Sequence, residues 1–332
     1  MKFLLLASFA WLVSSFAPAD ELKRERLPAD VDFVVHFDME GFKQTQLWKS
    51  LSDGPQGAEL REGLEDMHEF KEHFGIDPFT EVRAVTLFKT KTEEEPTVVL
   101  FSTSPEIDGA LTRFQKEAGY QRITESGIEL HTWSEGDGDT VFAYVHTAAS
   151  QERVVVLAGN RASALRAARV LRNEEPSHAR DGSLLRVAPA PGSFLYLASA
   201  EIPHVAEFTP ASQVFGLAQG IQVDLGEAGG FLRGHMGVTT GSPEDALNIS
   251  NVANGLISLA RLASDEVGEA MELLTGLRLN TRGSEVTVDF EFGIERLMEI
   301  LRSLEDSGDD VGDDDGDADE GRSEVRIHHR IK

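Results

Sequence analysis

The segment LPADVDFVVHFDMEGFKQTQLWKSL, residues 27–51, decides the fold, because its polarity alternates with a period of two before a helical pattern begins. The odd-numbered residues of 31–38 are Val31, Phe33, Val35 and Phe37, and the even-numbered residues are Asp32, Val34, His36 and Asp38. Successive side chains of a strand point to opposite faces of a sheet. The segment therefore predicts a turn, a strand with one apolar and one largely polar face, and a helix.

Similar patterns recur along the chain. Further strands are predicted over 121–124, 128–133, 140–147, 153–158 and 192–202, and hairpins over 81–104, 220–240 and 276–292. Helices are predicted over 104–119, 160–172, 203–218, 242–262, 266–274 and 293–304, with Asn160 as the N-cap of the second. Hairpin-linked strands with helices between them predict an α+β fold, in which mainly antiparallel sheets carry helices on one face.

The order of these elements divides the chain into two halves, residues 27–172 and 184–304, joined by the polar connector 173–183. Each half runs strand, helix, hairpin, helix, strands, helix. Ser104-Pro105-Glu106 and Ser242-Pro243-Glu244 open corresponding helices. An internal duplication with an extra hairpin in the first half explains this order, and so does convergent strand–helix patterning.

The first 19 residues have the features of a signal peptide, with a basic residue, an apolar stretch and the cleavage pattern Ala17-Pro18-Ala19. The apolar stretch, residues 3–13, is shorter than the roughly twenty residues that span a bilayer. An uncleaved anchor is the alternative. We expect a mature chain that begins near Asp20, a linker over 20–26, no later transmembrane segment, and export. With no cysteine, the core must be stable without disulfides.

The net charge of −26 makes nucleic acids and anionic membrane surfaces unfavourable partners. Ten acidic residues stand among residues 305–320, and the last nine residues are EVRIHHRIK. We expect 305–332 to be a disordered acidic tail with a basic end. Its aspartates do not fit a calcium loop, because Glu320 and Arg326 stand where glycine and glutamate are required. Weak attraction of cations or basic proteins is the expected property, and the partner is otherwise unknown.

His36 and Asp38 are the candidate catalytic residues, since they share one face of the predicted strand. An imidazole and a carboxylate there can orient one another or begin a metal site, but zinc needs at least three protein ligands. His131, His146 and His235 also lie in predicted strands and supply that third ligand if their strands adjoin. The alternative is that both side chains face water on the uncovered side of the sheet.

Short catalytic motifs are absent from the sequence. It has no G-x-S-x-G elbow, no Walker loop and no G-x-G-x-x-G. In HEFKEH, His68 and His73 are five residues apart, which places them on diverging faces of one helix rather than in a zinc motif. We predict no cofactor and no metal site.

Residues 27–50 resemble the start of exported bacterial proteins of unknown function, common in planctomycete-like genomes, with a signal peptide and two loosely repeated α+β halves. The resemblance implies a periplasmic or extracellular location and this architecture, without an activity. Our first hypothesis is a non-catalytic exported binding or structural protein. The alternative is an uncharacterised hydrolase or metal-dependent enzyme that uses His36 and Asp38. An enzyme requires a concave pocket around His36.

Overall fold

The computed structural model describes residues 21–53, 71, 77–92, 98–116, 119–134, 140–181, 189–190, 192–200, 216–262 and 276–308. The predicted signal peptide, the His68 and His73 pair, the predicted helix over 266–274 and the tail after Gly308 lie outside these ranges. The predicted helix over 203–218 lies mostly outside them as well, and strand β9 begins at its last residue.

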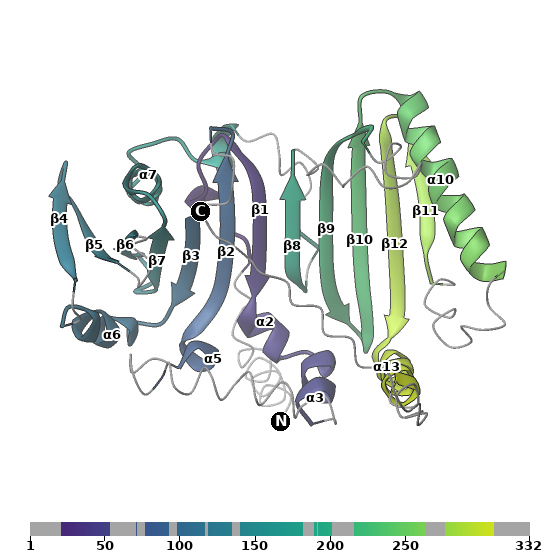
Figure 1. Cartoon of the computed structure of the whole chain (residues 1–332), viewed down its shortest axis with the longest axis horizontal. Coiled ribbons are helices and arrows are strands. Elements are labelled where there is room, and N and C mark those ends of the chain that lie inside the picture. Colours follow the sequence, from purple (N-terminus) through teal and green to yellow (C-terminus); the bar gives the residue numbers. More distant parts are fainter. Residues whose placement is uncertain are drawn as a thin grey trace, which may run out of the picture.

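Twelve strands of the described part form one sheet in the order β11-β12-β10-β9-β8-β1-β2-β3-β7-β6-β5-β4 (Figure 1). All neighbouring strands are antiparallel. The strands are β1 Val31–Asp38, β2 Val82–Thr90, β3 Val98–Thr103, β4 Gln121–Glu125, β5 Ile128–Ser134, β6 Thr140–Thr147, β7 Arg153–Ala158, β8 Ser193–Ser199, β9 Ala218–Ala228, β10 Phe231–Thr240, β11 Arg278–Arg282 and β12 Glu285–Gly293. The predicted strands and hairpins are confirmed.

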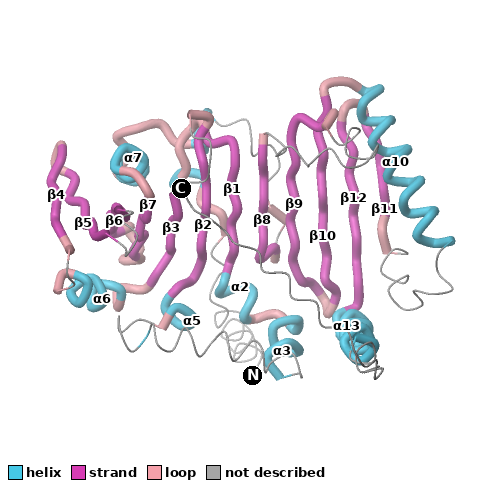
Figure 2. The backbone as a smooth tube through the Cα atoms, viewed as in Figure 1, coloured by secondary structure: helices cyan, strands magenta, loops and turns pink. Residues whose placement is uncertain are grey.

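Helices lie on the faces and along one end of this sheet (Figure 2). They are η1 Arg24–Arg26, α2 Met39–Lys43, α3 Gln46–Asp53, α5 Pro78–Glu81, α6 Ile107–Phe114, α7 Arg161–Leu171, α8 His178–Asp181, α10 Pro243–Leu262 and α13 Ile294–Gly308. Asn160 caps α7 as predicted, accepting a hydrogen bond from the Ser163 amide at 2.9 Å. Helix α6 begins at Ile107, three residues after Ser104, the first residue of the predicted helix. No helix among the described residues is long and apolar enough to cross a membrane.

The two predicted halves meet in the middle of the sheet, where β1 pairs with β8. Val35 lies opposite Leu197 and His36 lies opposite Tyr196. The chain thus forms a single continuous antiparallel sheet of an α+β fold rather than a separate sheet for each half. Outward from this joint, the first half runs β1-β2-β3-β7 and the second runs β8-β9-β10-β12.

One face of the sheet, here called the α7 face, carries the larger core. Val34, Phe88, Leu100 and Val156 on this face are buried. They pack with the apolar side of α7, which consists of Ala164, Leu165, Ala167, Ala168 and Leu171. Three alanines allow the helix axis to approach the sheet closely, and burial of these apolar groups is the main stabilising contribution.

Helix α10 packs on the opposite face, here called the α10 face. Its Ala246 and Ile249 form a second core with Val238 and Val286. Their sequence neighbours Gly237 and Thr287 lie in the same cross-strand row as Val34, on the α7 face. Successive residues of a strand point to opposite faces, so the two valines point away from the α7 face. The expectation that helices pack on one face is therefore wrong. Each half has an amphipathic helix, but α7 and α10 cover opposite sides.

Helices α2 and α3 cover the end of the α10 face through an aromatic cluster. Phe42 lies 5.3 Å from Phe37 and 5.0 Å from Phe194, measured between ring centroids, and Trp48 lies 5.5 Å from Phe42. Phe37 and Phe194 come from adjacent strands of different halves. The cluster therefore attaches the segment after β1 to both halves.

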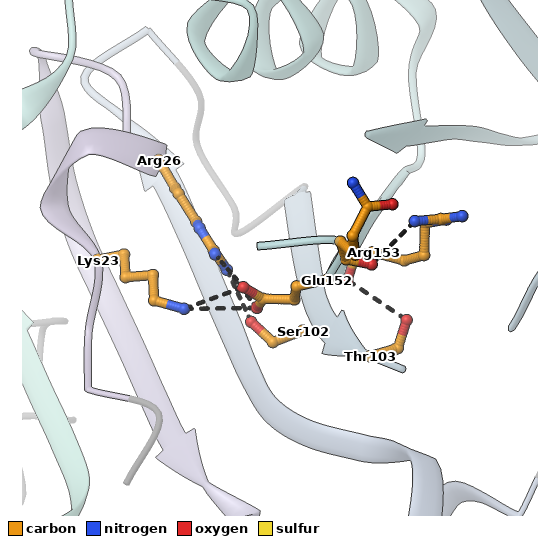
Figure 3. Close-up of polar contacts among 7 residues, drawn as sticks. Lys23, Arg26, Ser102, Thr103, Glu152 and Arg153 are labelled. Carbon is orange, nitrogen blue, oxygen red and sulfur yellow. Dashed lines mark hydrogen bonds and ion pairs between the residues drawn. The ribbon is translucent and has the colours of Figure 1, made fainter. Parts of the chain in front are cut away.

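Residues 21–27, here called the N-terminal strap, lie against the α7 face. Arg26 donates to both carboxylate oxygens of the buried Glu152, at 3.0 and 2.7 Å, and to the Ser102 hydroxyl at 2.8 Å. Lys23 reaches the same carboxylate at 3.1 Å, so both cations converge on it (Figure 3). Leu27 is fully buried. Within the predicted linker over 20–26, Leu22 therefore packs against the core, and Lys23 and Arg26 are ion-paired to the sheet.

The predicted connector 173–183 is also attached to the body. The His178 amide donates to the Leu27 carbonyl at 2.8 Å, and Pro28 forms an isolated bridge with Ser177. His178 is buried and begins α8. At the other end of the second half, α13 continues to Gly308, so residues 305–308 of the predicted tail are helical.

Candidate functional site

A row of polar side chains crosses the α7 face from the second half into the first. Directly paired residues of antiparallel strands share a face, and the strand register therefore defines the row. The polar row consists of Arg278, Asp289, His235, Asp224, Tyr196, His36 and Thr86, on β11, β12, β10, β9, β8, β1 and β2. Beyond Thr86, the row continues with Leu100 and Val156 beneath α7. The polar row brings together residues that are up to 253 positions apart, from 36 to 289.

The part of the polar row on β9, β10, β11 and β12 lies in a cleft of about 450 Å³. Helix α10 packs on the other face, and α13 lies at the end of β10 and β12 (Figure 1). The charged residues that line the cleft are Asp224, Glu227, Arg233, His235, Arg278, Asp289 and Glu291. Its volume is within the range of small-molecule sites.

His235 is held by a carboxylate. Its Nδ1 lies 2.7 Å from Oδ1 of Asp289 on the neighbouring strand. Since an ionised carboxylate only accepts hydrogen bonds, Nδ1–H is the donor. Its Nε2 lies near Gly237: a Cβ atom added to that glycine would be 3.7 Å from Nε2. The pair therefore presents an imidazole whose orientation is fixed by the Nδ1 hydrogen bond.

Asp224 is the buried carboxyl group of the cleft, with 5% of its surface exposed. It accepts a hydrogen bond from the Ser193 hydroxyl at 3.2 Å. Burial raises the pKa of Asp224 above its ordinary value, although Ser193 and the neighbouring His235 oppose the rise. Within the described ranges, no lysine, arginine or histidine lies within ion-pair distance of this carboxylate.

Each arginine of the cleft lies beside an acidic residue. Arg233 donates to Glu291 at 2.7 Å, and Arg278 lies opposite Asp289 in the register. Glu227 has a structural role, because its oxygens accept the backbone N–H groups of Gln46 and Leu47 at 2.8 and 2.9 Å. These amides open α3, so Glu227 fixes that helix to β9. Among the described lining residues, four acidic side chains outnumber two arginines.

The predicted catalytic residues, His36 and Asp38, do not lie in this cleft. His36 belongs to the polar row but is 6% exposed, and its Nδ1 lies 2.8 Å from the Thr86 hydroxyl. The space beside it, under the strap, is about 10 Å³ and holds at most one water. Asp38 is 1% exposed, and its Oδ1 accepts the Gly41 amide at 2.8 Å as the N-cap of α2.

The interpretation that these two side chains face open water is therefore wrong. The strap covers His36, and Asp38 is turned inward to cap the helix that follows its strand. The concave pocket that we set as the condition for an enzyme at His36 is filled by residues of the strap. His36 and Asp38 thus have structural contacts that explain their positions without catalysis.

The other strand histidines do not converge on His36. His131 on β5 and His146 on β6 are separated from β1 by β2, β3 and β7, and His235 is separated from it by β9 and β8. His131 instead bonds the Tyr120 hydroxyl at 2.7 Å. No cluster of three metal-binding side chains occurs in the part of the chain that the structure describes.

The sequence reasoning named His235 but missed Asp224 and Asp289 as its neighbours. A signal was present, since the charged residues and histidine of 231–240 and 285–292 all stand at odd positions: Arg233, His235, Glu285, Asp289 and Glu291. Parity alone assigns these residues to a polar face. Their contact depends on the register between β9, β10 and β12.

No family model matches the sequence. A search of curated proteins found no match. Solved structures of TP0453 in crystal forms III and I are similar to this chain at 11% and 13% identity. These alignments cover 85% and 86% of this chain and 98% and 99% of TP0453, with TM-scores of 0.45 and 0.43. The likeness is distant and assigns no activity.

Proposed function

We propose that this chain is an exported, non-catalytic binding protein that holds a small polar ligand in the cleft of the second half. The observation that carries the proposal is the cleft itself, with a buried carboxyl group and a carboxylate-fixed imidazole on neighbouring strands. Groups mounted on a paired sheet keep their positions without a ligand, which lowers the entropic cost of binding.

The pairing of the polar groups favours binding over catalysis. The Ser193 hydroxyl donates to Asp224, whereas His235 bonds Asp289. A serine nucleophile requires a base within hydrogen-bonding reach. In this arrangement the imidazole and the hydroxyl have different partners, so the two side chains do not form a serine–histidine pair, and we assign them to recognition of a ligand.

Export is part of the proposal, with a bacterial periplasmic or extracellular location. It is supported by the signal-peptide pattern of residues 1–19 and the resemblance of residues 27–50 to exported bacterial proteins. We also propose that the halves arose by internal duplication. The orders β1-β2-β3-β7 and β8-β9-β10-β12 correspond, and α6 and α10 follow equivalent strands. Strands β4 and β5 are then the extra hairpin of the first half.

The binding proposal is tested by thermal denaturation of the mature chain with a panel of cationic, anionic and neutral polar compounds. A ligand that binds only the folded state raises Tm. The matched variant is Ala190→Trp, because Ala190 is exposed at the cleft and an indole there fills it without altering a strand. We expect at least one class to raise Tm of the native chain and not of the variant. Equal shifts in both proteins would contradict binding in the cleft.

A further inference from the structure

We propose that the ligand of the cleft is a small organic cation whose ammonium group binds the Asp224 carboxylate. The inference rests on the proposed binding function and specifies the chemical class of the ligand. It follows from the pairing of positive and negative side chains within the cleft.

Each positive group of the cleft that the structure describes already has an acidic neighbour. Arg233 contacts Glu291, and His235 contacts Asp289, both at 2.7 Å. Arg278 lies opposite Asp289 in the register. An anionic ligand would have to replace a carboxylate at one of these positions, and it would meet the other acidic residues at short range. The arrangement therefore disfavours anions.

Asp224 differs from Asp289 and Glu291 because its partners among the described residues are neutral donors, the Ser193 hydroxyl and the Ala190 backbone N–H. It is more than nine-tenths buried and lines the cleft. A buried carboxylate without a cation pays a desolvation cost that a neutral hydrogen bond only partly offsets. An ammonium group delivered by a ligand supplies the missing charge, and three N–H donors of that group can also reach the neighbouring acceptors of the cleft.

The dimensions of the cleft favour an organic cation over a bare ion. A volume of about 450 Å³ is far larger than a single ion needs. Metal-binding geometry is not present among the described residues. The net charge of −26 raises the local concentration of cations near the whole molecule. Selectivity must therefore come from the cleft and not from the overall field.

The test compares two probes of equal length, putrescine and 1,4-butanediol, by isothermal titration calorimetry on the mature chain at 150 mM salt. The salt screens attraction to exposed acids, including those of the tail. Asp224→Asn removes the charge with little change of shape. The matched control is Glu244→Gln, which removes one charge from an exposed acid on α10, on the opposite face of the same half.

We expect putrescine to bind the native chain and the Glu244→Gln variant alike, and Asp224→Asn at least about tenfold more weakly, since a hydrogen bond to a charged group contributes on that order. Butanediol should bind at least about tenfold more weakly than putrescine on the same ground. Ala190→Trp should abolish the signal, and it tests the site while the Asp224 side chain itself is unchanged.

Three results would overturn the inference. Butanediol binding as tightly as putrescine would refute the cationic class and leave the binding function standing. Equal loss in Asp224→Asn and Glu244→Gln would assign binding to overall charge. No heat with putrescine would also refute the class, and the compound panel then decides separately whether the cleft binds anything.

Discussion

Replacing Glu152 by glutamine should destabilise the protein more than any surface charge change, because Glu152 joins the N-terminal strap to the sheet. Its side chain is 6% exposed, and that of Arg26 is 14% exposed. Burial by itself would raise the pKa of Glu152, but the hydrogen bonds and charges of Arg26 and Lys23 outweigh it and hold the pKa at about 2. Glu152→Gln leaves both cations without their anion.

The size of the effect follows from this pKa. A carboxyl group whose pKa falls from 4.5 to about 2 on folding contributes about 3 kcal/mol at neutral pH. Because the folded-state pKa is the lower one, the contribution is complete above pH 4.5 and disappears as the pH falls toward 2. The cost of Glu152→Gln should therefore be about 3 kcal/mol at pH 7 and about half of that at pH 3.

Urea denaturation followed by circular dichroism at both pH values measures this cost. The matched control is Glu299→Gln, which breaks an exposed pair with Arg296 on α13 and should cost less than about 1 kcal/mol. The reasoning is refuted if Glu152→Gln costs no more than the control, or if its cost is the same at pH 7 and pH 3.

Three further outcomes are expected. Asp38→Ala should lower the free energy of unfolding by about 1 kcal/mol through loss of the α2 cap, with putrescine binding unchanged; a change in calorimetric affinity would contradict a purely structural role. Burial lowers the pKa of His131, so stability should fall as the pH drops below 6.5, and urea titrations should show a smaller decrease in His131→Gln. Gly226→Ala should cost at least about 1–3 kcal/mol, since its Cβ would lie 2.6 Å from the Gly192 carbonyl oxygen in a paired strand; a neutral result in thermal denaturation would refute that steric argument.

Much of the local structure follows from the sequence. Alternation over 31–38 predicts β1 with its observed bounds, and the two glycines at 229–230 predict the turn between β9 and β10. Both glycines have positive φ, 63° and 80°, which a glycine adopts without steric cost. Asn160 predicts the start of α7. These features depend on interactions between residues that are close in the sequence, so the sequence alone predicts them.

Burial of the polar parity of β1 could not be predicted in this way. A strand pattern separates two faces but does not identify which face receives a helix or a strap. Here the face with His36 and Asp38 is the more buried one, because α7 and residues 21–27 pack on it. Asp38 directly precedes the predicted helix, a position at which an aspartate commonly acts as an N-cap. This role accounts for Asp38 without a catalytic function.

The sequence by itself determined the antiparallel α+β class, the hairpins and the polar parity of the second half, since each depends on the order of polar and apolar residues over a short span. Only the tertiary structure decided that both halves share one sheet, that α7 and α10 cover opposite faces, and that Asp224, His235 and Asp289 meet in a cleft. The physical reason is that strand register and helix docking are set by contacts between distant segments. The free energy of such a contact depends on both segments, so the pattern of one segment alone does not predict it.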